Sequence, residues 1–312
     1  MAEPGACIAL LEPLHPEAEA VLAAAASLRP GLGAPLPGVA AIVTRGMGRI
    51  PAEALAAAGA TLRCVARVGA GTDNVDVAAA TAAGLPVFYA PEAFTASTAE
   101  HALALLLAVC RRLPALDGAV RAGDWAARGG PAGLDLAGRR LGIIGLGRIG
   151  RRFGALAQAL GMEVCAWSRH SRDPRFPQRP LPSLLAGSDV VSLHLSLAEE
   201  TRGFLGAERL AAMKPGAILI NVARGALLDE PALAAALASG RLRGAGLDVL
   251  AQEPPPTDHP LLQLPQVVLT PHTGALTEGA YRLACLQVAS AVVRYLGSGT
   301  ADPALVRNPE VL

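Results

Sequence analysis

Short apolar runs alternate along this chain with longer, alanine-rich stretches, which predicts strands and helices in turn. In the first part of the chain the expected strands are CIALL (7–11), VAAIVT (39–44), LRCVARV (62–68) and PVFYA (86–90). The expected helices between them are PEAEAVLAAAASL (16–28) and DNVDVAAATAAG (73–84), the second ending at Gly84. Such alternation is typical of βαβ units and a parallel sheet.

A second series of the same kind follows a long helix expected over residues 95–113. The segment 117–138 is rich in glycine and is expected to be irregular. The expected strands beyond it are RLGIIG (140–145), EVCAWS (163–168), DVVSLHL (189–195), AILINVA (217–223), LRGAGLDV (242–249) and QVVLT (266–270). A last helix over 275–297 is expected to pack back on the first series.

The repeated layout, on a chain of 312 residues, predicts two domains. We expect an α/β protein in which both domains are Rossmann-like or flavodoxin-like doubly wound parallel sheets, with a cleft between them. Hydrophobic residues make up 52% of the chain and charged residues 17%, which fits well-buried cores and argues against disorder.

The charge and cysteine pattern narrows the class of protein. A formal net charge of +1 provides no broad field for nucleic acid or an anionic membrane. The five cysteines are scattered without a CxxC pair, and no two histidines have metal-ligand spacing, so reduced thiols and no metal site are expected. The N-terminal stretch lacks the basic region of a signal peptide, and HALALLLAVC (101–110) is too short to span a bilayer. We therefore expect a cytoplasmic protein.

The run GLGRIG (145–150) joins an apolar strand to a helical stretch. Gly145 allows a tight turn, Gly147 lets the backbone approach a pyrophosphate, and Gly150 lets helix and strand pack closely. The free N–H groups of the helix start then face the anion. Because strand and helix flank the run, it indicates a dinucleotide site. The loop residues expected to bind the cofactor are Gly145, Gly147, Arg148, Ile149 and Gly150.

The end of the next strand bears on which dinucleotide binds. NAD sites usually place a carboxylate about 20 residues beyond the glycines, where it binds the ribose 2′-hydroxyl. Here the strand ends in Ser168, followed by Arg169. No carboxylate at this tip repels a 2′-phosphate, and a guanidinium can bind one with two hydrogen bonds. The pattern favours NADP, and NAD stays open.

Three later strand ends carry charged or titratable side chains: Arg224 in INVARGALLDE, Glu253 in GLDVLAQEPPP and His272 in LTPHTGALT. In an open α/β sheet, the carboxyl ends of the strands line the ligand crevice. Each residue alone has an ordinary explanation on a surface or in a turn. Their shared position at one sheet edge favours a common catalytic site, and His194 at another strand end is expected near the cofactor.

At this point the chain resembles the D-isomer-specific 2-hydroxyacid dehydrogenases. The matching motifs occur in the family's order over nearly the whole chain: RVGAGTDNVD, LGIIGLGRIGRR, LHLSLAEETRGFLG, MKPGAILINVARGALLDE, GAGLDVLAQEPPP and LTPHTGALT. The resemblance implies a substrate domain of residues 1–97 plus 285–312. An NAD(P)-binding Rossmann domain of residues 98–284 would be inserted within it.

The resemblance also implies roles for the residues at the strand ends. His272 is the expected general acid and base, and Glu253 would pair with it and favour its imidazolium. Arg224 would bind the substrate carboxylate and polarise the carbonyl group. The backbone N–H groups of the segment that precedes Gly71 would help to hold that carboxylate. Those residues are Val68, Gly69 and Ala70.

Two further residues are placed beside the cofactor by the same resemblance: Asp248 on the nicotinamide side, and Thr98 on the long helix. The chain departs from the family at Tyr89, where asparagine is usual, and at Ser196, where proline is usual. The remaining histidines are expected to cap, pack or lie on the surface. They are His15, His101, His170 and His259.

The function implied is the transfer of a hydride between NAD(P)H and a small 2-oxo acid such as glyoxylate or hydroxypyruvate, by a homodimer. Two alternatives stay open: a dinucleotide-sensing corepressor without turnover, and a phosphoglycerate dehydrogenase. A formate dehydrogenase is disfavoured because that class has glutamine where Glu253 stands. The sequence does not identify which 2-hydroxy acid is the substrate.

Overall fold

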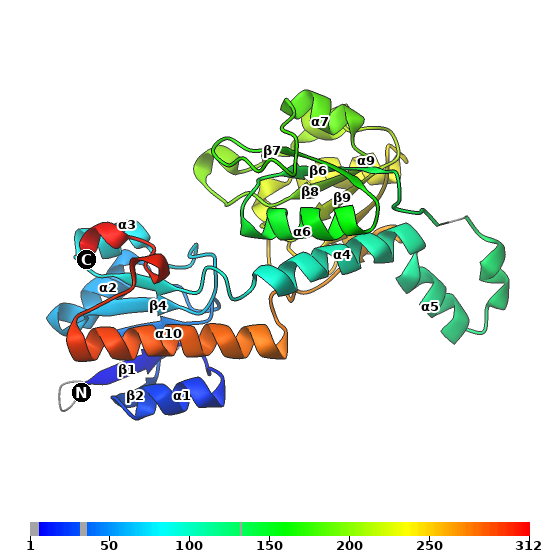
Figure 1. The fold of residues 1–312 in the computed structure, drawn as a ribbon. Helices are drawn as coiled ribbons and strands as arrows, with labels where there is room; N and C mark the ends of the chain where they lie inside the picture. Colours follow the sequence, from blue (N-terminus) through cyan, green and yellow to red (C-terminus); the bar gives the residue numbers. More distant parts are fainter. Residues whose placement is uncertain (1–5, 32–35, 132) are drawn as a thin grey trace. The chain divides into compact units, whose positions relative to one another are not determined.

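The computed structural model describes residues 6–31, 36–131 and 133–312. The chain divides into two compact units, and each is described by itself (Figure 1). The first unit consists of Met1–Phe94 and Leu276–Leu312, and the second of Thr95–Ala275.

A five-stranded parallel sheet forms the centre of the first unit. Its strands are β1 (Cys7–Leu10), β2 (Ser27–Pro30), β3 (Ala41–Thr44), β4 (Cys64–Arg67) and β5 (Val87–Tyr89). The order β2-β1-β3-β4-β5 is that of the flavodoxin-like fold. All four residues of β3 are buried, because a central parallel strand is covered on both faces. The expected doubly wound α/β sheet is therefore confirmed in this unit.

Four helices pack on this sheet: α1 (Pro16–Ala23), α2 (Ala52–Ala58), α3 (Val77–Ala82) and α10 (Glu278–Ser298). The last helix lies beside α1, as Figure 1 shows. Its Tyr295 ring meets the Phe88 ring of β5 with centroids 5.5 Å apart, and Arg63 donates a hydrogen bond to the Leu296 carbonyl at 2.7 Å. The C-terminal segment Leu276–Leu312 thus belongs to the first unit.

The expected helix over 16–28 is wrong at its end. The helix stops at Ala23, and Ser27–Pro30 form β2 instead. This strand is short and lies at the edge of the sheet, where it pairs with β1 alone. Proline is tolerated on an edge strand because the missing N–H would face away from the ladder. The alanine-rich context gave no local sign of a strand, since its pairing depends on a distant partner.

A six-stranded parallel sheet forms the second unit, in the order β11-β10-β9-β8-β6-β7. The strands are β6 (Arg140–Ile144), β7 (Glu163–Trp167), β8 (Val190–Leu193), β9 (Ala217–Asn221), β10 (Leu242–Leu247) and β11 (Val267–Leu269). An isolated parallel bridge between Ala166 and Gln178 adds one more pairing beyond β7. With it, the order becomes that of a dinucleotide-binding Rossmann sheet, which reverses between β6 and β8.

Successive residues of these strands face opposite cores. Ile143 packs in the cluster formed with α4 (Thr95–Arg111) and α6 (Arg148–Ala159). Ile144 packs in the cluster on the other face, which includes α7, α8 and α9. The bounds of those three helices are Leu181–Gly187, Ala207–Ala212 and Glu230–Ala238. This alternation is the period of two that a strand covered on both faces requires.

The glycine-rich segment 117–138 is less irregular than expected. Leu113–Arg121 form helix α5, and Trp125–Gly129 form a 3₁₀ turn. Pro114 at the helix start fits because an N–H there has no intrahelical partner. No residue of α5 is buried, although Leu113, Leu116 and Val120 recur at helical spacing along it. Leu113, Val120 and Trp125 remain 53%, 52% and 70% exposed.

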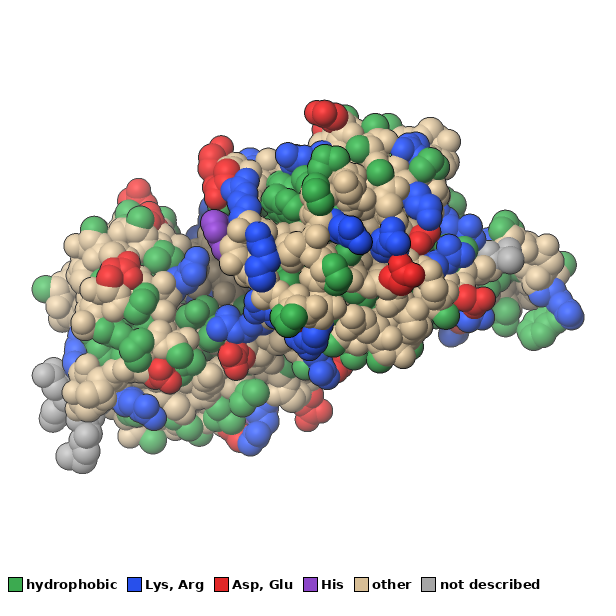
Figure 2. Space-filling view, turned by 45° about the horizontal axis from the view of Figure 1, so that its top comes forward, with side chains coloured by type: hydrophobic (Ala, Val, Ile, Leu, Met, Phe, Trp, Pro, Cys, Tyr) green, Lys and Arg blue, Asp and Glu red, His purple; other side chains and the backbone are tan. Residues whose placement is uncertain are grey.

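The surface carries both signs of charge. On the face drawn in Figure 2, Lys and Arg side chains lie scattered among Asp and Glu, in keeping with the formal net charge of +1. Across the residues that the structure describes, no helix combines the length and the apolar character needed to cross a membrane.

Candidate functional site

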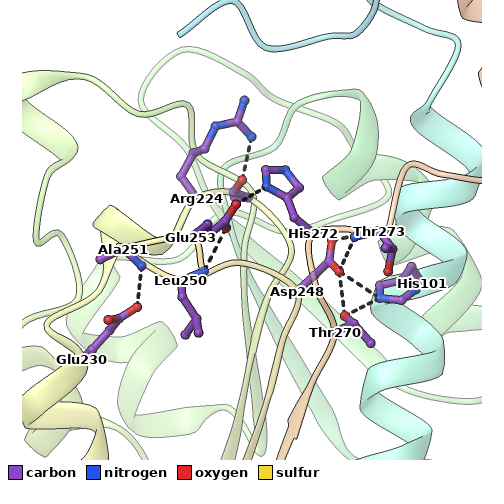
Figure 3. Close-up of polar contacts among 12 residues, drawn as sticks. His101, Arg224, Glu230, Asp248, Leu250, Ala251, Glu253, Thr270, His272 and Thr273 are labelled. Carbon is purple, nitrogen blue, oxygen red and sulfur yellow. Dashed lines mark hydrogen bonds and ion pairs between the residues drawn. The ribbon is translucent and has the colours of Figure 1, made fainter. Parts of the chain in front are cut away.

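The carboxyl ends of the strands in the second unit lie along one edge of its sheet, as parallel strands require. Six candidate residues of this unit lie one to three positions beyond those ends. Gly145 follows β6, Ser168 follows β7, His194 follows β8, Arg224 follows β9, Asp248 follows β10 and His272 follows β11. Figure 3 shows Arg224, Glu253 and His272 gathered at this edge, with Asp248 beside them.

Two glycines of the GLGRIG loop are required by the packing of the chain itself. Gly145 has a φ of 97°, and a methyl group there would lie 2.6 Å from the carbonyl carbon of His194. A methyl group on Gly150 would lie 2.5 Å from the Gly145 oxygen. The first allows the turn after β6, and the second lets α6 start close to that turn.

Gly147 is different, because nothing in the described chain requires a glycine there. Its φ is −80°, and a methyl group on it would meet no described heavy atom within 4 Å. Gly147 lies at the N-cap of α6, where no side chain caps the first N–H groups. Open space above unpaired N–H groups is what a pyrophosphate needs for close approach. The residues of the loop therefore fit a dinucleotide.

The tip of β7 carries no carboxylate. The Ser168 N–H donates to the Gln178 side chain at 3.1 Å, and the Ser168 carbonyl accepts from Arg172 at 2.6 Å. Arg169 is 49% exposed, and its guanidinium lies 4.0 Å from a Glu200 carboxylate oxygen. An exposed pair at that separation is weak, so the guanidinium can still bind an anion.

His194 stands at the switch between β6 and β8. Its N–H donates to the Ile144 carbonyl at 2.7 Å, and its ring Nε2 forms a 2.9 Å hydrogen bond with Ser192 Oγ. The ring also packs on Phe153 with centroids 5.6 Å apart. Burial lowers the pKa of His194 to about 4, so the ring is neutral near pH 7.

His272 and Glu253 form the closest titratable pair of the edge, with Nδ1 and Oε2 2.8 Å apart (Figure 3). The other Glu253 oxygen accepts the Leu250 N–H at 3.1 Å. Partial burial of Glu253 raises its pKa, but the hydrogen bond and charge of His272, with the Leu250 N–H, outweigh burial and lower the pKa overall. Both side chains remain accessible, with exposed fractions of 45% for His272 and 40% for Glu253.

Asp248 holds the segment that carries His272. Its carboxylate is 2% exposed, and it accepts hydrogen bonds from the Thr270 hydroxyl at 2.6 Å, the Thr273 N–H at 2.9 Å and the Gly274 N–H at 2.8 Å. The His272 N–H donates to the Asp248 carbonyl at 2.8 Å. Burial raises the pKa of Asp248, and these hydrogen bonds, with one from His101, lower it below the ordinary value.

His272 has a φ of 55°, in the left-handed region that side chains rarely occupy. The surrounding hydrogen bonds hold this backbone conformation in place. Such strain is found at functional sites, where it directs a side chain. Here it accompanies the direction of the His272 ring toward Glu253 rather than toward the buried Asp248 (Figure 3).

Arg224 is fixed by the turn that follows β9. The Asn221 side chain donates to the Arg224 carbonyl at 2.9 Å, and the Arg224 guanidinium donates to the Ala223 carbonyl at 2.7 Å. The next residue, Gly225, packs so tightly on the Leu250–Ala251 peptide that a methyl group would overlap it. This contact brings the ends of β9 and β10 together.

A cavity of about 250 Å³ opens beside the titratable pair. It is bordered by the acidic residues Asp248 and Glu253, by His272, and by apolar side chains and prolines of the two adjoining loops. An apolar pocket with a few convergent polar groups is the usual setting of a small-molecule site.

The remaining predicted site residues lie elsewhere. Thr98 is buried in the first turn of α4. In the first unit, the Val68 N–H donates to the Thr44 carbonyl at 2.8 Å and the Gly69 N–H to the Arg67 carbonyl at 2.9 Å. Of these three residues, only the exposed Ala70 has an N–H for which the described part of the chain offers no acceptor. Of the expected carboxylate-binding N–H groups, Ala70 is thus the one ready to donate.

His101 was expected to cap, pack or lie on the surface, and its hydrogen bonds were missed. Its Nε2 lies 2.9 Å from Thr270 Oγ1 and 3.3 Å from Asp248 Oδ1. No local sequence signal could have found this network, because α4, β10 and β11 meet only in the folded unit. His15 does cap a helix, accepting the Glu17 N–H at 3.3 Å.

Comparison with known proteins gives a family match over the second unit. Residues 103–274 match the family model described as "D-isomer specific 2-hydroxyacid dehydrogenase, NAD binding domain". A D-3-phosphoglycerate dehydrogenase of Mycobacterium bovis is 45% identical over 269 residues, which cover 85% of this chain and 50% of that protein. The chain therefore spans about half the length of this relative.

Two further similarities involve proteins of more similar length. A glyoxylate reductase of Korarchaeum cryptofilum is 41% identical over 259 residues, 80% of this chain and 77% of that protein. The solved structure of an NADPH-dependent glyoxylate/hydroxypyruvate reductase of Sinorhizobium meliloti, in complex with NADP and malonate, superposes with a TM-score of 0.87 at 30% identity. That match covers 96% of each chain.

Proposed function

Because this chain belongs to the D-isomer-specific 2-hydroxyacid dehydrogenase family, we propose that it is an NAD(P)-dependent oxidoreductase. The reaction is hydride transfer between the nicotinamide and a small 2-oxo acid of the glyoxylate or hydroxypyruvate type. The observation that carries this proposal is the 2.8 Å contact between His272 and Glu253 at the carboxyl edge of a dinucleotide-binding sheet.

In the direction of reduction, the bound dinucleotide supplies a hydride to the carbonyl carbon. His272 donates the proton that the carbonyl oxygen needs, so that a 2-hydroxy acid forms. Glu253 accepts the hydrogen bond of the other ring nitrogen and stabilises the protonated ring before transfer. Arg224 binds the substrate carboxylate and polarises the carbonyl group.

The GLGRIG loop would hold the dinucleotide, because Gly147 and the start of α6 offer open space and backbone N–H donors to its pyrophosphate. His194, neutral near pH 7, and Asp248 flank the cofactor side of the edge, with Thr98 on α4. Ser168 and Arg169 at the end of β7 support NADP over NAD, because a guanidinium there can bind the 2′-phosphate. The NADPH-dependent relative from S. meliloti agrees with this preference.

We propose a homodimer in the cytoplasm. Support for the dimer comes from the exposed Leu113, Val120 and Trp125 of α5 and its following turn, since apolar side chains on one surface segment mark association sites. Support for a reducing compartment comes from the five cysteines, all of which are free thiols.

A second candidate function is phosphoglycerate dehydrogenation. The relative from M. bovis, at 45% identity, favours it. The two functions differ in substrate alone, because both use the same acid–base pair and the same hydride donor.

The experiment that tests the proposal is a panel of 2-oxo acids with each reduced cofactor, followed by the absorbance of the nicotinamide. Oxidation of NADPH or NADH with glyoxylate or hydroxypyruvate is the expected result. Turnover confined to 3-phosphohydroxypyruvate would establish the second candidate. Tight binding of the dinucleotide without turnover of any acid would refute both enzymes and favour a dinucleotide-sensing binding protein.

A further inference from the structure

One buried carboxylate closes the loop that carries Glu253. Glu230, the first residue of α9, accepts the Ala251 N–H on Oε1 at 2.7 Å (Figure 3). Its other oxygen, Oε2, lies 3.1 Å from Nε2 of His259. The two side chains are only 8% and 13% exposed. A single side chain therefore holds both ends of the loop from Ala251 to His259.

The hydrogen-bonding direction of His259 follows from its second contact. Its Nδ1 lies 3.3 Å from the Leu261 N–H at the start of the 3₁₀ turn Pro260–Gln263. A backbone N–H can only donate, so Nδ1 is the acceptor and Nε2 carries the hydrogen that is donated to Glu230. His259 thus links the turn after the loop to the carboxylate beneath it.

The start of the loop is also fixed by a backbone contact. Gly225 presses on the Leu250–Ala251 peptide with no room for a side chain. Glu230 holds the Ala251 N–H of the same stretch. The start of the loop is therefore held between the Arg224–Gly225 turn and the first turn of α9.

Glu253 needs such support, because burial does not fix it. Its side chain is 40% exposed, and within its own loop it accepts one hydrogen bond, from the Leu250 N–H at 3.1 Å. A shift of about 1 Å in a catalytic group can cost as much as about 100-fold in rate. The position of Glu253 against His272 thus depends on how firmly the ends of its loop are held.

We propose that Glu230 and His259 are positioning residues that hold Glu253 at hydrogen-bonding distance from His272. Neither touches the reacting atoms. The effect on turnover rests on the proposed function, whereas the effect on the Glu253–His272 contact does not.

The test compares a variant that removes both contacts of Glu230 with one that removes only its contact with His259. Glu230→Ala removes both. His259→Asn keeps an acceptor for the Leu261 N–H and removes the donor to Glu230, whereas His259→Gln restores a donor near the Nε2 position. We expect Glu230→Ala to lower kcat by about 10- to 100-fold, with the KM for the cofactor within about twofold of the parent. His259→Asn should lower kcat less, and His259→Gln should recover part of the loss.

The second readout does not depend on turnover. The carboxyl carbon of Glu253 can be titrated by NMR in protein labelled at glutamate, with Glu253→Gln identifying the signal. The contact with His272 lowers the pKa of Glu253, so releasing the loop should raise that pKa in Glu230→Ala and His259→Asn. A purely structural role would lower the melting temperature and leave this pKa unchanged.

The outcomes are distinguishable. A higher Glu253 pKa in His259→Asn, reversed in His259→Gln, supports the proposal even if Glu230→Ala does not fold. An unchanged pKa in the folded variants overturns it. If the parent protein turns over no 2-oxo acid, the proposed function fails, and the titration alone decides the positioning role.

Discussion

Asp248 Oδ1 accepts a hydrogen bond from Thr270 Oγ1 at 2.6 Å, across the neighbouring strands β10 and β11. The same carboxylate accepts two backbone N–H groups just beyond His272. The segment that carries the proposed acid is therefore tied to the interior of the sheet, while its ring remains accessible.

Asp248→Asn should destabilise the protein and reduce turnover. An amide group replaces one carboxylate oxygen with a donor, which then faces either the Gly274 N–H or the Thr270 and Thr273 donors. We expect a loss of about 1–3 kcal/mol in the free energy of unfolding. Urea denaturation measures it, with the exposed Asp117→Asn as a matched control. An unfolding free energy equal to that of the control would contradict this role.

His272→Gln should lower kcat by about 10²- to 10⁴-fold, because glutamine cannot donate a proton to the carbonyl oxygen. Cofactor affinity should stay the same, since the proposed pyrophosphate donors belong to the GLGRIG loop after β6, whereas His272 follows β11. Steady-state kinetics and titration of the bound dinucleotide measure the two effects. His15→Gln, in the first unit, is the control. Near-normal turnover in His272→Gln would refute the assignment.

The three loop glycines should respond differently to alanine. Gly145→Ala and Gly150→Ala place a methyl group 2.6 Å and 2.5 Å from backbone atoms, so both should lower the melting temperature. Gly147→Ala meets no described atom within 4 Å and should fold normally. It should nevertheless weaken dinucleotide binding, because the methyl group occupies the expected place of the pyrophosphate. Unchanged dinucleotide affinity in a folded Gly147→Ala protein would remove the pyrophosphate from this position.

Arg169→Ala should shift cofactor preference from NADPH toward NADH. Loss of a guanidinium that binds the 2′-phosphate removes a charge-assisted contact. The kcat/KM with NADPH, divided by the kcat/KM with NADH, should therefore fall by about tenfold. Arg128→Ala, on the exposed turn after α5, provides the comparison. If the ratio is the same in both variants, the preference does not depend on Arg169.

His194 should make the fold less stable in mild acid. The pKa of its ring is about 4 in the folded unit, against an ordinary value of 6.5. Between these values the unfolded chain binds a proton that the folded chain does not, so stability falls as the pH falls through this window. We expect a loss on the order of 2 kcal/mol between about pH 7 and about pH 4. Urea unfolding of the parent and of His194→Gln measures it, and equal pH dependence in the two would show that another group is responsible.

The sequence was most informative where local pattern and chemistry coincide. The GLGRIG run reveals its strand, its turn and its helix because Gly145 and Gly150 meet local demands of the backbone, while Gly147 leaves open space at the helix start. The strand ends that carry Arg224 and His272 were also identifiable, since apolar runs mark the strands and parallel topology aligns their ends.

What the sequence could not provide depends on contacts between distant elements. The edge strand Ser27–Pro30 exists because it pairs with β1, and the alanine run before it extends the helical pattern up to its first residue. Helix α5 carries Leu113, Leu116 and Val120 at helical spacing, but the glycines in and after it indicated a loop. The Glu230–His259 contact joins α9 to a loop beyond β10, and nothing in either local pattern indicates the other.

The tight packing of Gly225 on the Leu250–Ala251 peptide has a consequence for protein engineering. Position 225 follows Arg224, whose guanidinium would anchor a substrate, and presses on the loop that carries Glu253 of the proton-transfer pair. A larger residue there would displace both together, so efforts to retune substrate choice should keep this glycine and vary the pocket walls instead.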